Sequence, residues 1–123
     1  MNYKFSNDRP IFLQLSEYIE ADILSGVFAE ESPLPSTTEL SVELKLNPTT
    51  TLKGVNILVD QGLGEKKRGI GMFVVKGARE KILKKKREAF NEEYLLPLIS
   101  IAKNLGIERD DLIKSIMEIY KWF

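Results

Sequence analysis

The chain has 123 residues, 18 of them Lys or Arg and 18 Asp or Glu, and it contains neither His nor Cys. This length suits one globular domain with room for an appendage. Without His and Cys, the commonest zinc, haem and iron–sulfur sites and the Ser-His-Asp and Cys-His nucleophilic sites are excluded. We therefore expect no metal, no cofactor and no enzymatic activity, and the lack of a signal-like or membrane-spanning apolar run predicts a cytoplasmic protein.

The beginning of the chain predicts an amphipathic helix over about residues 10–25. Pro10 suits the first turn of a helix, and Gly26 suits the position after its last turn. Between them, apolar residues recur at the spacing of one helix face: Phe12, Leu15, Ile19 and Ile23. The next segment, residues 27–35, is acidic and contains two prolines, so we expect a loop or a very short strand there.

A capping motif predicts the beginning of a second helix. In Ser36-Thr37-Thr38-Glu39, the Ser36 hydroxyl and the Glu39 carboxylate can each bond a backbone amide that the first helical turn leaves free. We expect this helix to run from Thr37 to Leu44.

A third helix is predicted over about residues 48–61, with Asn47 as its cap and Pro48 in its first position. We expect Thr51 to face inward. The buried side is further expected to include Leu52, Val55, Leu58 and Val59. Two helices separated by so short a connection form a helix-turn-helix unit.

Two short strands are predicted next, over about residues 63–67 and 71–76. Gly69, between them, supplies the positive φ that a tight hairpin turn needs. A hairpin directly after a helix-turn-helix is a wing. Residues 1–77 are therefore expected to form a winged helix-turn-helix domain.

Residues 78–123 are predicted to form a two-helix C-terminal hairpin, so the fold class is mainly α with a small β-wing. Pro97 is expected to kink or break the first of these helices, Asn104 and Gly106 to form the turn, and residues 108–123 to form the last helix. Of the last 30 residues, 17 are apolar, which is more than such a hairpin buries against itself. We therefore expect residues 78–123 to be a dimerisation region that packs on a second copy.

The order and spacing of three motifs resemble the winged-helix domain of GntR-type bacterial transcription regulators, over about residues 9–76: Pro35-Ser36-Thr37-Thr38-Glu39-Leu40, Asn47-Pro48-Thr49-Thr50 and Arg68-Gly69-Ile70-Gly71-Met72-Phe73-Val74. The short helical tail is similar to that of the YtrA subfamily, whose members dimerise through a small helical region. The resemblance implies a homodimeric, sequence-specific DNA-binding regulator, a repressor associated with the nucleoid. Its third helix would enter the major groove of a near-palindromic operator, with the wing on flanking DNA.

DNA contacts are expected from three places: the beginning of the second helix, the first turns of the third helix and the hairpin turn. The predicted residues are Ser36, Thr38, Asn47, Thr49, Thr50, Lys53, Lys67, Arg68 and Gly69. The family often has Arg where this chain has Thr38, Pro48 and Leu52, so its operator sequences are not transferred. The residues expected at the dimer interface are Tyr94, Leu98, Ile101, Leu105, Leu112, Ile116 and Tyr120.

Another interpretation is a winged-helix protein-interaction module that has lost DNA binding. It is favoured by the missing arginines and by the charge of residues 1–77, where 8 basic residues face 10 acidic ones, a net of −2. The basic run of residues 81–87 is interpreted as a solvated helix face, with phosphate contact as the alternative. For Ser36, capping alone is the alternative to a phosphate contact, and a small-molecule effector of the tail stays open.

Overall fold

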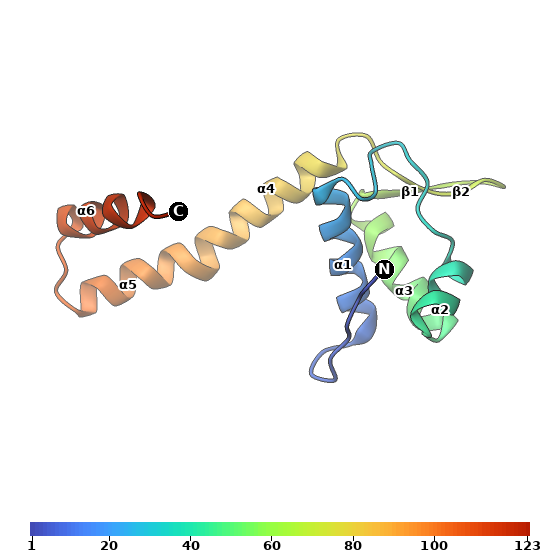
Figure 1. Cartoon of the computed structure of the whole chain (residues 1–123), viewed down its shortest axis with the longest axis horizontal. Coiled ribbons are helices and arrows are strands. Elements are labelled where there is room, and N and C mark those ends of the chain that lie inside the picture. The colour runs from blue at the N-terminus through green and yellow to red at the C-terminus, as the bar shows by residue number, and fades with distance from the viewer. The chain divides into compact units, whose positions relative to one another are not determined.

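The elements predicted from the sequence occur in the predicted order in the computed structural model, which describes residues 1–123 (Figure 1). They are α1 (Ile11–Ser25), α2 (Thr37–Leu44), α3 (Pro48–Asp60), β1 (Gly64–Lys67), β2 (Gly71–Val74), α4 (Ala78–Phe90), the π-helical turn η1 (Asn91–Leu95), α5 (Leu96–Asn104) and α6 (Arg109–Tyr120). Their contacts divide the chain into two units, Met1–Lys84 and Lys85–Phe123. None of the helices combines the length and the apolar character that crossing a membrane requires.

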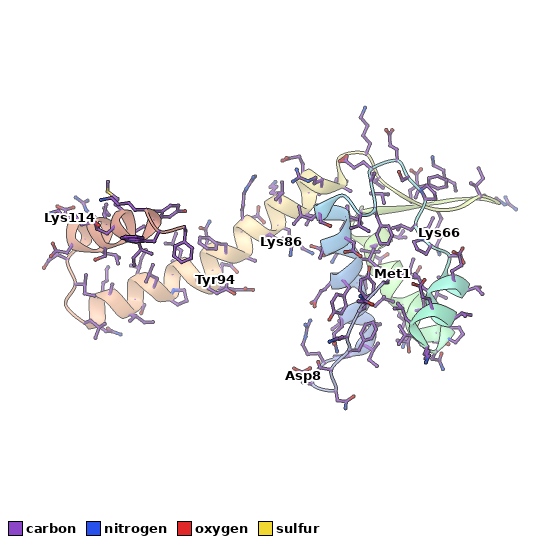
Figure 2. All side chains as sticks on the ribbon, viewed as in Figure 1. Met1, Asp8, Lys66, Lys86, Tyr94 and Lys114 are labelled. Atoms are coloured by element: carbon purple, nitrogen blue, oxygen red, sulfur yellow. The ribbon has the colours of Figure 1, made fainter.

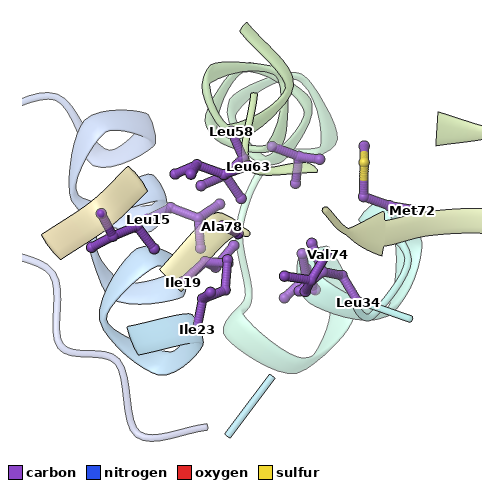
Figure 3. Close-up of a cluster of buried hydrophobic side chains, with 12 residues drawn as sticks. Leu15, Ile19, Ile23, Leu34, Leu58, Leu63, Met72, Val74 and Ala78 are labelled. Atoms are coloured by element: carbon purple, nitrogen blue, oxygen red, sulfur yellow. The ribbon is translucent and has the colours of Figure 1, made fainter. Parts of the chain in front are cut away.

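The core of the first unit lies between α1, α3 and the wing (Figure 3). The predicted face of α1 is buried at Leu15, Ile19 and Ile23, and Phe12 is half-buried. Both N-terminal caps of the helix-turn-helix form as predicted. Ser36 and Glu39 complete the capping box of α2, and the Asn47 side chain accepts a hydrogen bond from the Thr49 amide at the beginning of α3. The first turns of α4 close this core, because Ala78 and Ile82 are buried in it. Residues 1–77 therefore share their unit with the beginning of α4.

The predicted orientation of α3 is wrong at one position. Val55 and Leu58 are buried as expected, but Leu52 is 43% exposed. Thr51 is fully buried, as predicted, and its hydroxyl accepts a hydrogen bond of 2.9 Å from the hydroxyl of Ser41 on α2. Since successive helix residues lie about 100° apart, burying Thr51, Val55 and Leu58 turns Leu52 out of the core.

Gly54 lets α1 and α3 approach each other closely. A Cβ atom at this position would lie 2.9 Å from Leu15 Cδ2 and 3.0 Å from the Phe12 carbonyl oxygen. The second neighbour is backbone, which cannot rotate away. The absence of a Cβ atom at Gly54 therefore permits the two helices to lie this close together.

We expect Gly54→Ala to lower the free energy of unfolding by about 1–2 kcal/mol, because the overpacking cost exceeds the gain in helix propensity. Chemical denaturation followed by circular dichroism measures this. Asp60→Ala, on the exposed side of the same helix, is the control and should not destabilise. If the Gly54→Ala variant were as stable as the parent protein, α1 and α3 would not be packed this closely at Gly54.

The wing is an antiparallel hairpin, and one residue from outside the hairpin, Pro33, pairs with its edge. Gly64 pairs with Val74 and Lys67 with Gly71, so both strands are slightly shorter than predicted. Gly69 in the turn has φ +75°, as expected. The acidic loop before α2 contributes the expected very short strand: Pro33 forms a bridge with Phe73 on the free edge of β2, flanked by backbone bonds such as Leu34 N to Met72 O at 2.8 Å. This third segment ties the hairpin to the beginning of the helix-turn-helix.

The first nine residues fold back along α1, which the sequence did not indicate. Tyr3 stacks on Tyr18 with ring centroids 4.6 Å apart, and Phe5 packs against the edge of the same ring. The Tyr3 hydroxyl donates to the Asp22 carboxylate, and burial together with this carboxylate raises the pKa of Tyr3. The segment therefore adds an aromatic layer to the outside of α1.

The helix that contains Pro97 continues past it, through a single π-helical turn. In η1 the amide of Leu96 bonds to the carbonyl of Asn91, five residues earlier. In a regular α-helix the ring of Pro97 would clash with the carbonyl four residues before it, and a wider turn relieves this clash. Pro97 then lies in the first turn of α5, where a missing amide hydrogen costs nothing. Gly106, with φ +69°, forms the turn to α6.

Candidate nucleic-acid interface

The free face of α3 begins directly after its cap. The Asn47 side chain accepts a hydrogen bond of 2.8 Å from the amide of Thr49, which fixes the beginning of the helix. In the first two turns Thr49, Leu52 and Lys53 are exposed, and Thr50 is half-buried. The Lys53 ammonium lies 5.8 Å from the centre of the Phe12 ring. These side chains present hydroxyl, apolar and cationic groups on the part of the unit that a helix-turn-helix protein inserts into the major groove.

The beginning of α2 lies at the edge of this surface. The Ser36 hydroxyl accepts from the Glu39 amide at 3.0 Å, and the Glu39 carboxylate accepts from the Ser36 amide at 3.5 Å. The capping box thus uses the amide of Ser36 and its hydroxyl oxygen as an acceptor. The amides of Thr37 and Thr38 make no hydrogen bond within the chain, so they are the free donors of this helix end.

The hairpin places its two lysines on opposite faces. Lys66 is opposite Met72, whose side chain is buried, whereas Lys67 shares the outer face with Phe73. The Lys67 ammonium lies over the Phe73 ring, 4.3 Å from its centre. Arg68 follows in the turn, which is closed by a bond of 2.9 Å from the Ile70 amide to the Lys67 carbonyl. None of the three cations is part of an ion pair, so their charge is available to an anionic partner. Lys66 is labelled in Figure 2.

A groove of about 430 Å³ separates α3 and the beginning of α2 from the wing. Its apolar lining includes Leu52 and Met72, and Lys66, Lys67 and Arg68 stand along its wing side. Of the nine predicted DNA-contact residues, Ser36, Lys67, Arg68 and Gly69 line this groove. The other five lie outside it, on α2, α3 and the turn between them: Thr38, Asn47, Thr49, Thr50 and Lys53.

Two residues outside the nine predicted contacts belong to the same surface, Leu52 and Lys66. Leu52 was assigned to the core together with Thr51, but the burial of Thr51, Val55 and Leu58 leaves it exposed. Lys66 stands one residue before the selected pair, and the alternation of side chains along a strand places it on the face toward the groove. The burial of Met72 opposite it is the signal that identifies this face.

The helical hairpin of the second unit carries a separate apolar groove between α5 and α6, of about 560 Å³. Three of the seven predicted dimer residues line it, namely Leu98, Leu112 and Ile116. The other four lie outside it and are 57–77% exposed: Tyr94, Ile101, Leu105 and Tyr120. From Asn91 to Phe123 only Ala102 is fully buried, so the hairpin leaves most of its apolar surface uncovered.

Comparisons with known proteins agree with this arrangement. The family model described as bacterial regulatory proteins, gntR family, matches residues 12–74. The chain is 30% identical to the HTH-type transcriptional repressor YtrA of Bacillus subtilis over 89% of this chain and 84% of that protein. It is 25% identical to the HTH-type transcriptional regulator YhcF of the same organism over 94% of each chain. The crystal structure of a GntR-family regulator from Bacteroides thetaiotaomicron superposes with a TM-score of 0.77 at 32% identity, over 90% of this chain and 96% of that one.

Proposed function

This chain belongs to the GntR family of bacterial transcription regulators and to its YtrA-like subfamily, and we propose that it acts as a homodimeric repressor on a near-palindromic operator. It is a DNA-binding regulator, not an enzyme, since the family consists of transcription regulators. In the proposed complex, α3 enters the major groove and the wing lies on flanking DNA. The site of action is the nucleoid in the cytoplasm.

The observation that carries the DNA-binding proposal is the placement of unpaired cations beside the free face of α3. Lys66, Lys67 and Arg68 line the wing side of the groove, and Lys53 extends the positive charge along α3. Phosphate contacts supply most of the affinity of such proteins, while base contacts supply the specificity. The net charge of −2 over residues 1–77 therefore does not oppose DNA binding, because charge at the contact surface decides it.

The uncovered hairpin supports the dimer. Isolated apolar side chains are common on protein surfaces, but a contiguous apolar patch marks an interaction site. Here the patch extends over both helices of the hairpin and encloses the groove lined by Leu98, Leu112 and Ile116. A second copy offers a surface of the same chemistry and shape. Twofold symmetry would then require two half-sites of opposite direction, which makes the operator near-palindromic.

Repression is proposed because YtrA of Bacillus subtilis carries the name of a repressor and is similar over most of both chains. A dimer bound across a promoter blocks polymerase without needing a further contact surface. The small size of the second unit fits a region whose first task is dimerisation.

The test is the salt dependence of operator binding by wing variants. A preferred sequence is first selected from a random duplex pool at near-physiological salt. We expect Lys67→Ala and Arg68→Ala each to weaken binding and to flatten the slope of log K against log salt by about one unit per lost phosphate contact in each bound subunit. Lys114→Ala removes an exposed lysine from α6 and is the control that should leave the slope unchanged.

The outcome also separates the two interpretations of the winged helix. Absence of an enriched sequence, together with binding that does not depend on salt, would reject the DNA-binding proposal in favour of the protein-interaction module. Normal DNA binding with unchanged slopes in both wing variants would instead remove the wing from the interface.

A further inference from the structure

Leu52 is an apolar side chain on the part of α3 that the core leaves free. It is 43% exposed, in contrast to Leu58 on the same helix, which is fully buried. Thr49, Leu52 and Lys53 are three and four residues apart, so they are neighbours on one helix face. Leu52 also borders the groove between α3 and the wing. It therefore lies between the polar end of α3 and the cations of the wing.

The charges around Leu52 indicate which kind of partner binds over this residue. The wing side of the groove carries Lys66, Lys67 and Arg68, none of them in an ion pair, so the occupant is anionic. The groove's remaining lining is largely apolar, including Met72 and the half-exposed Leu52. Duplex DNA combines an anionic backbone with an apolar group in its major groove, the C5-methyl of thymine.

A leucine side chain can neither donate nor accept a hydrogen bond. It therefore cannot read the donor and acceptor pattern of a base pair, and it would strip water from a polar base edge without replacing the lost bonds. Against a thymine methyl, the same side chain gains an apolar contact. A base pair that places this methyl opposite Leu52 is thus favoured over the other pairs.

We propose that Leu52 is a specificity-determining residue that selects thymine at one position of each operator half-site through contact with its C5-methyl group. This inference rests on the proposed DNA binding and adds a named base to it. Thr49 and Lys53, the polar neighbours, read or bind other groups of the same half-site.

Replacing thymine by uracil tests the proposal, because it removes the methyl group and leaves the hydrogen-bonding groups unchanged. In the selected operator, each thymine is replaced in turn by deoxyuridine, and binding is measured at fixed salt. We expect one position per half-site at which the loss of the methyl weakens binding about fourfold, or about fifteenfold when both half-sites are changed. Leu52→Ala should bind the thymine operator more weakly and should no longer distinguish thymine from uracil at that position.

Two further variants keep the result specific to this contact. Leu52→Met retains an apolar side chain and should keep the preference for thymine, whereas Val27→Ala removes an exposed apolar side chain elsewhere and should leave it unchanged. An operator bound specifically, with no uracil-sensitive position that depends on Leu52, would overturn this inference and leave the DNA-binding function standing. Failure to select any operator would overturn both.

Discussion

Ile116→Glu is expected to convert the proposed dimer to a monomer and to weaken binding to the full operator by about 10²–10⁴-fold, the range by which linking two binding modules exceeds one alone. Ile116 is 36% exposed on α6 and lines the groove with Leu98 and Leu112. In a packed interface its replacement would bury an unpaired carboxylate, which costs several kcal/mol. In a monomer the same carboxylate is solvated, so the variant loses the dimer and keeps its fold.

Sedimentation velocity at micromolar concentration and titration of full and half operators test this prediction together. Half-site binding should be unchanged, because the winged helix belongs to the other unit, Met1–Lys84. The control is Lys114→Glu, which places the same charge on the same helix at an exposed position outside the groove. A variant Ile116→Glu that remains dimeric would place the interface elsewhere, and a monomeric parent protein would reject the dimer proposal.

Local backbone chemistry made the helix-turn-helix predictable. The capping box at Ser36 and the Asn47 cap with Pro48 define where α2 and α3 begin, and both caps form. Such signals depend only on residues within one turn of each other, so they can be read without knowing the tertiary structure. The beginning of α2 was therefore predicted to the residue.

Predictions that depended on tertiary packing were less successful. The sequence places Leu52 in the core together with Thr51, but α3 buries the face that contains Thr51, whose hydroxyl accepts from Ser41, and Leu52 turns outward. The distribution of Lys66 and Lys67 between the faces of the wing likewise depends on which face contacts α3. No local pattern specifies these relations, because each involves a residue from another element.

The helical hairpin shows a different limit. The apolar excess of the last 30 residues was visible in the sequence and predicts an interaction surface. Which of these residues would share a groove was not visible, because the face of α5 that lines it depends on how α5 packs against α6. The predicted stripe of Tyr94, Leu98, Ile101 and Leu105 follows a neighbouring face of this helix, and only Leu98 of the four lines the groove.

The second large effect is expected from Leu58→Ala, which should lower the free energy of unfolding by about 2–5 kcal/mol. Leu58 is fully buried where α1, α3 and the wing meet, and its carbonyl accepts the Leu63 amide at 2.8 Å (Figure 3). Truncation of the side chain removes its apolar contacts. It also leaves a cavity, because backbone hydrogen bonds hold the surrounding elements in place and prevent them from filling it. Since domains of this size are stable by about 5–15 kcal/mol, a large part of the total is lost.

Leu52→Ala is the matched control, because it makes the same change on the same helix at a half-exposed position. It should cost less than about 1 kcal/mol, as surface substitutions usually do. Thermal unfolding of the two variants measures this difference. At a temperature where both are folded, Leu58→Ala should retain the preference for thymine over uracil and Leu52→Ala should lose it. If Leu52→Ala were as destabilising as Leu58→Ala, Leu52 would belong to the core. It could then not contact a base, and its proposed role in base selection would be rejected.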